Sequence, residues 1–180
     1  MRLVLLLIVL PWMAAAQSCP PAPDISDAKS VWMRKLQFAP DASVAQTINT
    51  EIWLLWSTAP DAKAQELLDN GMERRSAYDF ERARAFLTEL IEYCPNYAEG
   101  WNQRAFVHFL NGDYAMAVDD LDKALELSPD HYAAMSGLAL SLMNLGRMEA
   151  AQSILSDAVA LNPWLPERSM LIDDPKGTEL

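Results

Sequence analysis

The stretch that decides the fold is Trp101–Pro129, which reads WNQRAFVHFLNGDYAMAVDDLDKALELSP. Gly112-Asp113 is a turn signal in its middle, between two segments whose apolar residues recur at helical spacing. In the second segment Ala117 and Leu121 lie four residues apart, on one face of a helix. Pro129 follows that helix and prevents it from continuing. The stretch therefore predicts two helices joined by a short turn.

The same pattern recurs at an interval of 34 residues on either side of this stretch. Five kinds of position keep the interval in one register: Pro95, Pro129 and Pro163; Ala83, Ala117 and Ala151; Leu87, Leu121 and Leu155; Gly71, Ala105 and Ala139; Leu90, Ala124 and Ala158. Such self-similarity indicates a repeat protein. We expect the repeats at 64–97, 98–131 and 132–165.

The residue types in these columns fit pairs of packed helices. Small side chains recur where the two helices of a pair come close, and the leucines fill the core between them. One local signal points elsewhere, since Asn70-Gly71 is also a good hairpin-turn dipeptide. The 34-residue register and the helical pattern around the dipeptide place Gly71 inside a helix instead.

These residues resemble the tetratricopeptide repeat (TPR) family, whose pattern is W-x2-L-G-x2-Y, then A-x3-F, then P. The middle copy is the most similar, through Trp101, Ala105, Tyr114, Ala117, Leu121, Ala124 and Pro129. Arg104 and His108 depart from the pattern, because the family has Leu and Tyr there. The resemblance, in particular to small exported bacterial TPR proteins, implies an all-α fold. It implies a right-handed α-solenoid of three TPR helix pairs.

A weaker pair of helices precedes the repeats. Apolar residues recur at helical spacing on both sides of Pro40-Asp41, which breaks the chain. We expect residues 24–60 to form a degenerate helical hairpin that packs on the first repeat and caps it. Residues 17–23, with three prolines, are expected to be a flexible leader. At the other end, residues 166–180 are expected to form a short cap and a tail.

Residues 1–16 have the pattern of a cleaved signal peptide, with the apolar run Leu3–Leu10 followed by the small residues Ala14–Ala16. The run is shorter than the roughly 20 residues that span a bilayer. We therefore expect a mature chain that begins at Gln17, lacks a membrane span and resides in the periplasm. A lipoprotein is an alternative, because Cys19 closely follows the apolar run.

Composition and motifs limit the classes of function. The formal net charge of −11 disfavours nucleic acid as a partner. The sequence has no phosphate-binding loop, dinucleotide motif or nucleophile elbow, so we expect no enzyme, no catalytic residue and no cofactor. His108 and His131 have no partner at metal-ligand spacing. We expect both histidines in the groove or on the surface, and no metal site.

Cys19 and Cys94 are the two cysteines of the chain. In an oxidising compartment an even number of cysteines suggests a disulfide. Cys94 also fits a small buried position at the end of a repeat helix, and Cys19 lies in the expected leader. Whether the two are bonded stays open at this point.

The TPR resemblance implies that the first helix of each repeat lines a concave groove. The groove residues that we expect to bind a partner are Met72, Arg75, Asn102, Phe106, Phe109, Leu140 and Met143. Phe106 and Phe109 offer ring area on one helix face, and Asn102 beside them can bond to a peptide backbone. The groove lacks the Lys and Arg cluster with which some TPR proteins clamp a C-terminal carboxylate.

The sequence thus predicts a non-catalytic protein–protein interaction scaffold that binds a peptide or protein segment in the groove. One alternative is a periplasmic adaptor in envelope assembly or cytochrome maturation, by analogy with exported TPR proteins. Another, from a different class, is an enzyme accessory subunit. The identity of the partner and the oligomeric state stay open.

Overall fold

The computed structural model describes residues 18–172, which form eight α-helices and one 3-10 helix. In chain order these are α1 (Ser26–Gln37), α2 (Ala42–Trp56), α3 (Ala62–Ser76), α4 (Phe80–Tyr93), α5 (Ala98–Asn111), α6 (Tyr114–Leu127), α7 (Tyr132–Asn144), α8 (Met148–Leu161) and η1 (Pro166–Met170). The all-α prediction is confirmed. The expected signal peptide, 1–16, and the residues of the expected tail beyond 172 lie outside the described residues. Within 18–172, no helix is long and apolar enough to cross a membrane.

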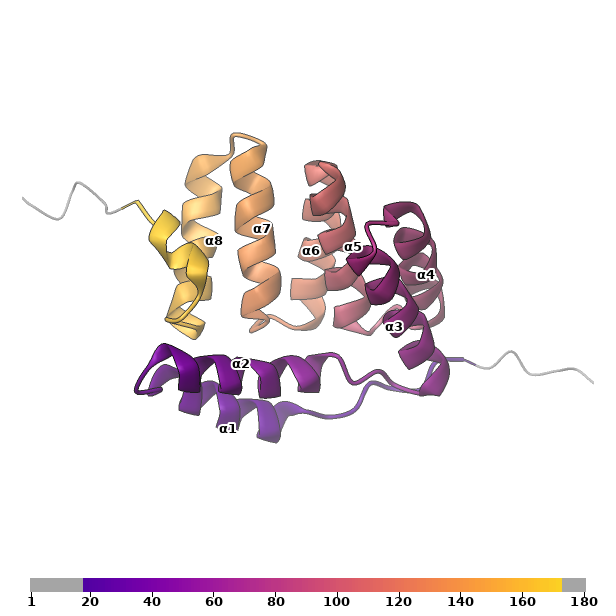
Figure 1. Ribbon diagram of the computed structural model, residues 1–180, viewed down its shortest axis with the longest axis horizontal. Coiled ribbons are helices and arrows are strands. Elements are labelled where there is room, and N and C mark those ends of the chain that lie inside the picture. The colour runs from indigo at the N-terminus through magenta and orange to yellow at the C-terminus, as the bar shows by residue number, and fades with distance from the viewer. Residues whose placement is uncertain (1–17, 173–180) are drawn as a thin grey trace, which may run out of the picture.

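Six of the helices form three consecutive pairs, α3 with α4, α5 with α6 and α7 with α8, which stand side by side (Figure 1). The turn inside each pair contains one residue with positive φ: Tyr78 at 59°, Gly112 at 83° and Gly146 at 73°. These residues are 34 apart, so the backbone repeats its conformation with the sequence period. Glycine adopts this region readily, whereas Tyr78 adopts it at a cost.

Gly71 lies inside α3, as the register predicted, and not in a hairpin turn. A Cβ added at Gly71 would lie 2.6 Å from Cγ of Leu87 in α4, which is closer than real Cβ atoms come. The equivalent residues Ala105 and Ala139 are fully buried. This column is therefore small because the two helices of each pair approach closely there.

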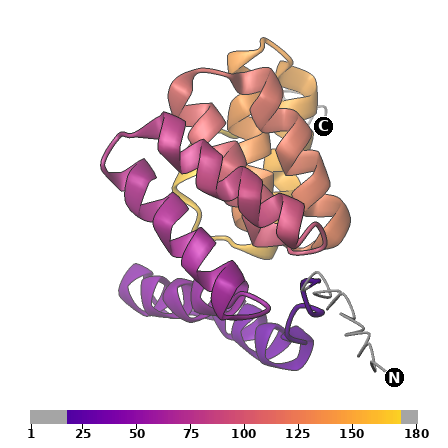
Figure 2. The ribbon, with the colours of Figure 1, turned by 90° about the vertical axis from the view of Figure 1, so that its right-hand side faces the viewer.

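The hairpin of α1 and α2, called the N-terminal hairpin below, contacts the first repeat at Tyr97, but it shares its hydrophobic core with the third repeat and not, as was expected, with the first. It lies across the ends of the repeat helices, beneath the second and third pairs, and the linker after α2 reaches the first pair (Figures 1 and 2). Ile48 and Ile52 of α2 share a core with residues of the third repeat and of the segment after it. Trp164, which is equivalent to Asn96 and Asp130 of the first two repeats, packs against this core, and its Nε1 donates to the carbonyl oxygen of Leu36 at 3.2 Å.

The last residue of each repeat contacts this hairpin. The Tyr97 hydroxyl donates to the carbonyl oxygen of Trp56 at 2.8 Å. The His131 ring stacks on the Trp56 ring with 3.7 Å between centroids and 11° between planes. Leu165 belongs to the core that α2 shares with the third repeat. One column of the 34-residue period therefore contacts α2, and two of its three members meet at Trp56, the last residue of that helix.

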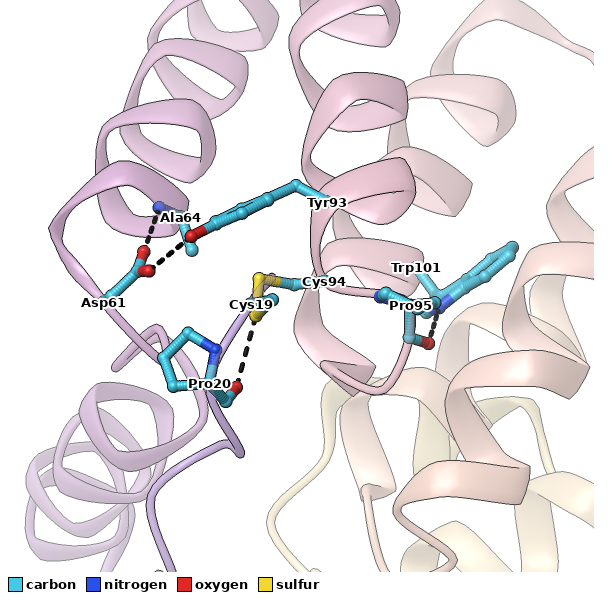
Figure 3. Close-up of a disulfide and its surroundings, with 8 residues drawn as sticks. All are labelled: Cys19, Pro20, Asp61, Ala64, Tyr93, Cys94, Pro95 and Trp101. Atoms are coloured by element: carbon cyan, nitrogen blue, oxygen red, sulfur yellow. Dashed lines mark hydrogen bonds between the residues drawn. A yellow bond between two sulfur atoms is a disulfide. The ribbon is translucent and has the colours of Figure 1, made fainter. Parts of the chain in front are cut away.

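Cys19 and Cys94 form a disulfide, across 75 residues of sequence (Figure 3). Cys94 is buried at the end of α4, and Cys19 packs against the core of the first repeat. The segment expected to be a flexible leader is thus anchored at Cys19. A cysteine in a disulfide has no thiol left to carry a lipid, so this bond and the lipoprotein alternative exclude each other.

Next to the disulfide, hydrogen bonds fix the start of α3 (Figure 3). The Asp61 carboxylate accepts from the backbone N–H of Ala64 at 2.8 Å and from the Tyr93 hydroxyl at 2.7 Å. The bond from Ala64, followed by the one from Tyr93, holds the pKa of Asp61 below its ordinary value. The same carboxylate therefore caps α3 and ties it to α4.

The close approach at Gly71 makes a prediction that separates packing from helix propensity. Gly71→Ala is expected to lower the free energy of unfolding by about 1–3 kcal/mol, because the new methyl group overlaps Leu87. Gly137→Ala is the matched control, since its Cβ would lie 3.4 Å from Leu121, in ordinary contact. The control is expected to gain up to about 1 kcal/mol from helix propensity. Urea unfolding followed by circular dichroism measures both, and equal stability of the two variants would refute the close approach.

Candidate functional site

A cavity of about 360 Å³ opens on the face formed by α5 and α7, and we call it the groove cavity. Trp53 of the N-terminal hairpin lies at one edge, and residues 165–167 lie at another. Its other lining residues include Asn102, Gln103, Phe106, Phe109, Ser136 and Leu140. A volume of this size is typical of binding pockets, and the mixture of rings and amides offers both apolar contact and hydrogen bonds.

Five of the seven predicted groove residues line this cavity: Arg75, Asn102, Phe106, Phe109 and Leu140. The other two, Met72 and Met143, do not. Met72 packs against the core of the first repeat, and Met143 packs against the core shared by the second and third repeats. The structure therefore brings α5 residues together with one residue from α3 and one from α7.

Phe106 is the more exposed of the two phenylalanine rings in the cavity, with 44% of its surface accessible. The guanidinium carbon of Arg75 lies 4.6 Å from the centre of this ring, and the Arg75 side chain also donates to the Gln103 side-chain oxygen. Burial lowers the pKa of Arg75, while the negative charge of Glu99 opposes that shift. Phe109 is partly covered, since its ring meets Tyr114 edge to face at 5.5 Å. The apolar contact area open to a ligand therefore centres on Phe106.

A buried carboxylate orients the polar side chains of the cavity. Glu99 is buried at the start of α5 and accepts from Gln103 at 2.5 Å, from Asn102 at 3.1 Å and from His131 at 2.9 Å. Gln103 in turn accepts from Arg75. Three donors therefore share one buried charge, as a buried carboxylate requires, and the Asn102 amide is held in a fixed orientation.

The hydrogen bonds of His131 define its tautomer. Its Nδ1 accepts from the backbone N–H of Ala134 at 3.2 Å and so caps α7. Nδ1 therefore carries no proton, and the proton on Nε2 is donated to Glu99. One face of the His131 ring is covered by the Trp56 ring of the N-terminal hairpin. His131 thus connects α2 to the residues that orient Asn102.

Both histidines were expected in the groove or at the surface, and both are buried. His108 lies beside an ion pair in which Arg104 donates to the two oxygens of Asp120 at 2.8 and 2.7 Å. Its Nε2 is 3.8 Å from Asp120 Oδ2, and its Nδ1 has no hydrogen-bond partner among residues 18–172. The expectation failed because His108 stands where the family places a buried Tyr. Burial lowers the pKa of His108, and the charge of Asp120 partly opposes this.

The network that joins Glu99, His131 and Arg75 was not predicted from the sequence. The 34-residue register contains a signal that could have found it. His131 and Tyr97 are equivalent residues of neighbouring repeats, and Glu99 follows Tyr97 by two positions.

No set of three or more potential metal ligands from His, Cys, Asp and Glu occurs within the described chain.

Three stacked pairs of helices with a cavity on one face define a helical-repeat protein. Models of the tetratricopeptide repeat family match residues 108–167 and 86–119. The chain therefore contains tetratricopeptide repeats within residues 86–167. A TPR repeat-containing protein of Rhizobium etli is 32% identical over 127 residues, which cover 69% of this chain and 56% of that protein. This chain thus spans little more than half the length of that relative.

Solved TPR domains have the same fold. The first TPR of Spaghetti, bound to the HSP90 peptide SRMEEVD, is similar with a TM-score of 0.59 at 21% identity, over 60% of this chain and 86% of that one. The TPR2B domain of yeast Sti1 in its pHsp70 complex gives 0.57 at 23% identity, over 62% of this chain and 91% of that one. At these identities the likeness establishes the fold alone.

The lowered pKa of His108 predicts a pH dependence of stability. The unfolded chain takes up a proton at higher pH than the folded chain, whose neutral His108 is buried beside Arg104. The stability that depends on neutral His108 is therefore complete above its ordinary pKa of 6.5 and is lost progressively as the pH falls from that value through the lower pKa of the folded chain. His108→Gln, which does not titrate, is expected to remove this loss.

Urea unfolding of both proteins, from about pH 7.5 to about pH 5.5, measures the effect. The parent is expected to lose more free energy of unfolding over this range than His108→Gln. The carboxylates are common to both proteins, so their contribution cancels in the difference. An equal loss in the two proteins would mean that His108 titrates as it does in the unfolded chain.

Proposed function

We propose that this TPR protein is a non-catalytic scaffold that binds a peptide, or an extended segment of a partner protein, in the groove cavity. The observation that carries the proposal is the exposed Phe106 ring in a preformed cavity, beside the oriented amide of Asn102. Exposed aromatic rings in concave sites give large contact area at little conformational cost. A role in core packing alone does not explain Phe106, because much of its ring stays exposed in the folded chain.

Asn102 is suited to a peptide backbone. One of its amide hydrogens is used by Glu99, which leaves the other hydrogen and the carbonyl oxygen to pair with a backbone C=O and N–H. The orientation is set before a ligand arrives, so little freedom is lost on binding. An apolar side chain of the ligand against Phe106 and a backbone pair at Asn102 together form the core of the proposed interface.

The charge of the cavity favours a neutral ligand segment. Arg75 and Glu167 are the charged lining residues, apart from His131, and Arg75 is already engaged by Gln103 and Phe106. The peptide in the Spaghetti complex, SRMEEVD, carries three acidic residues. Arg75 is the one Lys or Arg side chain among the described residues that line the groove cavity, so the cavity has no cluster of cations that could hold such an acidic peptide. This supports a neutral peptide as the ligand of this chain.

Selection from a library of random dodecapeptides displayed on phage tests the proposal. A Phe106→Ala, Asn102→Ala double variant is expected to bind a selected peptide at least about tenfold more weakly than the parent, because both anchors are lost. Fluorescence anisotropy with the labelled peptide measures this. Leu110→Ala is the matched control, since Leu110 is 42% exposed on the same helix and lies outside the cavity. A folded double variant with parental affinity would show that the cavity is not the binding site.

We also infer export to the periplasm. The disulfide between Cys19 and Cys94 supports it, because such bonds persist in oxidising compartments, and so does the signal-peptide pattern of residues 1–16. Thiol trapping and N-terminal sequencing of the chain from cells test the inference. The expected result is a chain that begins at Gln17 and has no free thiol. A retained 1–16 segment, or a lipid on Cys19, would contradict it.

A further inference from the structure

A second cavity of about 380 Å³ adjoins the groove cavity, and we call it the hairpin cavity. Its walls are α2, the start of α7 and the segment after α8. The two cavities share four lining residues: Trp53, Ala133, Leu165 and Pro166. Because the same side chains border both, the cavities meet at Trp53 and form one continuous cleft along the N-terminal hairpin.

The face of α2 toward the hairpin cavity carries groups that can bind a ligand. Gln46, Asn49, Thr50 and Trp53 follow one another at spacings of three, one and three residues, on one side of the helix. Trp53 is 41% exposed. The Asn49 side-chain oxygen accepts from the Tyr132 hydroxyl at 2.8 Å and from the Asn162 amide at 3.1 Å. The position of Asn49 is thereby fixed, while its own amide hydrogens have no bond to the described residues.

The charge of the lining selects the kind of occupant. No Asp, Glu, Lys or Arg lines the hairpin cavity, although 22% of the chain is charged and its net charge is −11. An uncharged ligand segment therefore fits the cleft without leaving a desolvated charge unpaired. Outside the cleft the acidic protein attracts basic residues. The side-chain amides supply both donors and acceptors, which match a polypeptide backbone.

We propose that the ligand of the groove cavity continues past Trp53 into the hairpin cavity, as one extended, uncharged polypeptide segment with basic flanks. This inference rests on the proposed function. One part of the segment contacts Phe106 and Asn102, and a second part lies against the Trp53 ring within reach of Gln46 and Asn49. Since the N-terminal hairpin supplies the second part of the site, α2 contributes to recognition as well as to folding.

A mutant cycle between protein and peptide tests the inference, with a dodecapeptide selected on the parent from the random phage library as the probe. Trp53→Ala is expected to weaken binding of the full peptide by about tenfold. Peptides shortened stepwise from each end are then measured on the parent, Trp53→Ala and Phe106→Ala. Trimming one end is expected to abolish the effect of Trp53→Ala while the effect of Phe106→Ala remains. Higher salt is expected to weaken binding through the basic flanks.

One control and one further variant of the hairpin cavity keep the outcomes distinct. Leu54→Ala removes a neighbouring side chain that is 47% exposed and outside both cavities, so it is expected to bind the peptide like the parent. Gln46→Ala, an exposed polar change, is expected to weaken binding without affecting folding. Parental affinity of folded Trp53→Ala would overturn this inference and leave the proposed function intact, as would binding of an oligosaccharide, not a peptide, at Trp53. Indifference of every selected peptide to Phe106→Ala would overturn the proposed function.

Discussion

The contact between α2 and the last residue of each repeat is the constraint on which the rest of the molecule depends. Tyr97, His131 and Leu165 recur every 34 residues, so stacking the repeats brings them to the same edge of the solenoid. The helix α2 contacts all three residues: Tyr97 by a hydrogen bond and His131 by a ring stack, both at Trp56, and Leu165 in the apolar core. The result is a wall beside the concave face, which converts an open groove into a cleft.

The sequence predicted the features that recur with the 34-residue period. It missed the features that depend on residues that differ between the repeats. The place of Gly71 against Leu87 followed from the interval, because every copy must solve the same packing problem. The place of the N-terminal hairpin did not, since an apolar stripe fits any apolar surface. Its contacts with Trp164, His131 and Asp130 depend on side chains that differ from one repeat to the next. In the candidate site, the positions on α5 were predictable from helical spacing. Met72 was not, because the twist between repeats decides whether such a side chain faces the groove or the core.

The buried polar network gives the cleft its geometry at some cost in stability. Glu99 accepts hydrogen bonds from three donors, but removing a carboxylate and a histidine from water costs free energy. The network therefore stabilises the fold less than apolar side chains of the same volume would. Trp56 adds to the cost, because its buried Nε1 has no hydrogen-bond partner within the described residues. What the network supplies is position. It links Trp56 of α2 to Asn102 of α5 through His131 and Glu99, so that the two parts of the cleft hold a fixed relation.

The disulfide stabilises the N-terminal hairpin that borders this cleft, and it contributes no side chain to the lining of the cleft. Neither Cys19 nor Cys94 lines the groove cavity or the hairpin cavity. The loop that the bond closes contains the whole N-terminal hairpin and the first repeat, and the loss of chain entropy in a loop of this length stabilises by about 4 kcal/mol. That is a large part of the roughly 5–15 kcal/mol that holds a typical domain folded. A ligand that reaches from Phe106 to Trp53 therefore meets a wall that is already in place, and less of its binding energy is lost in ordering the protein.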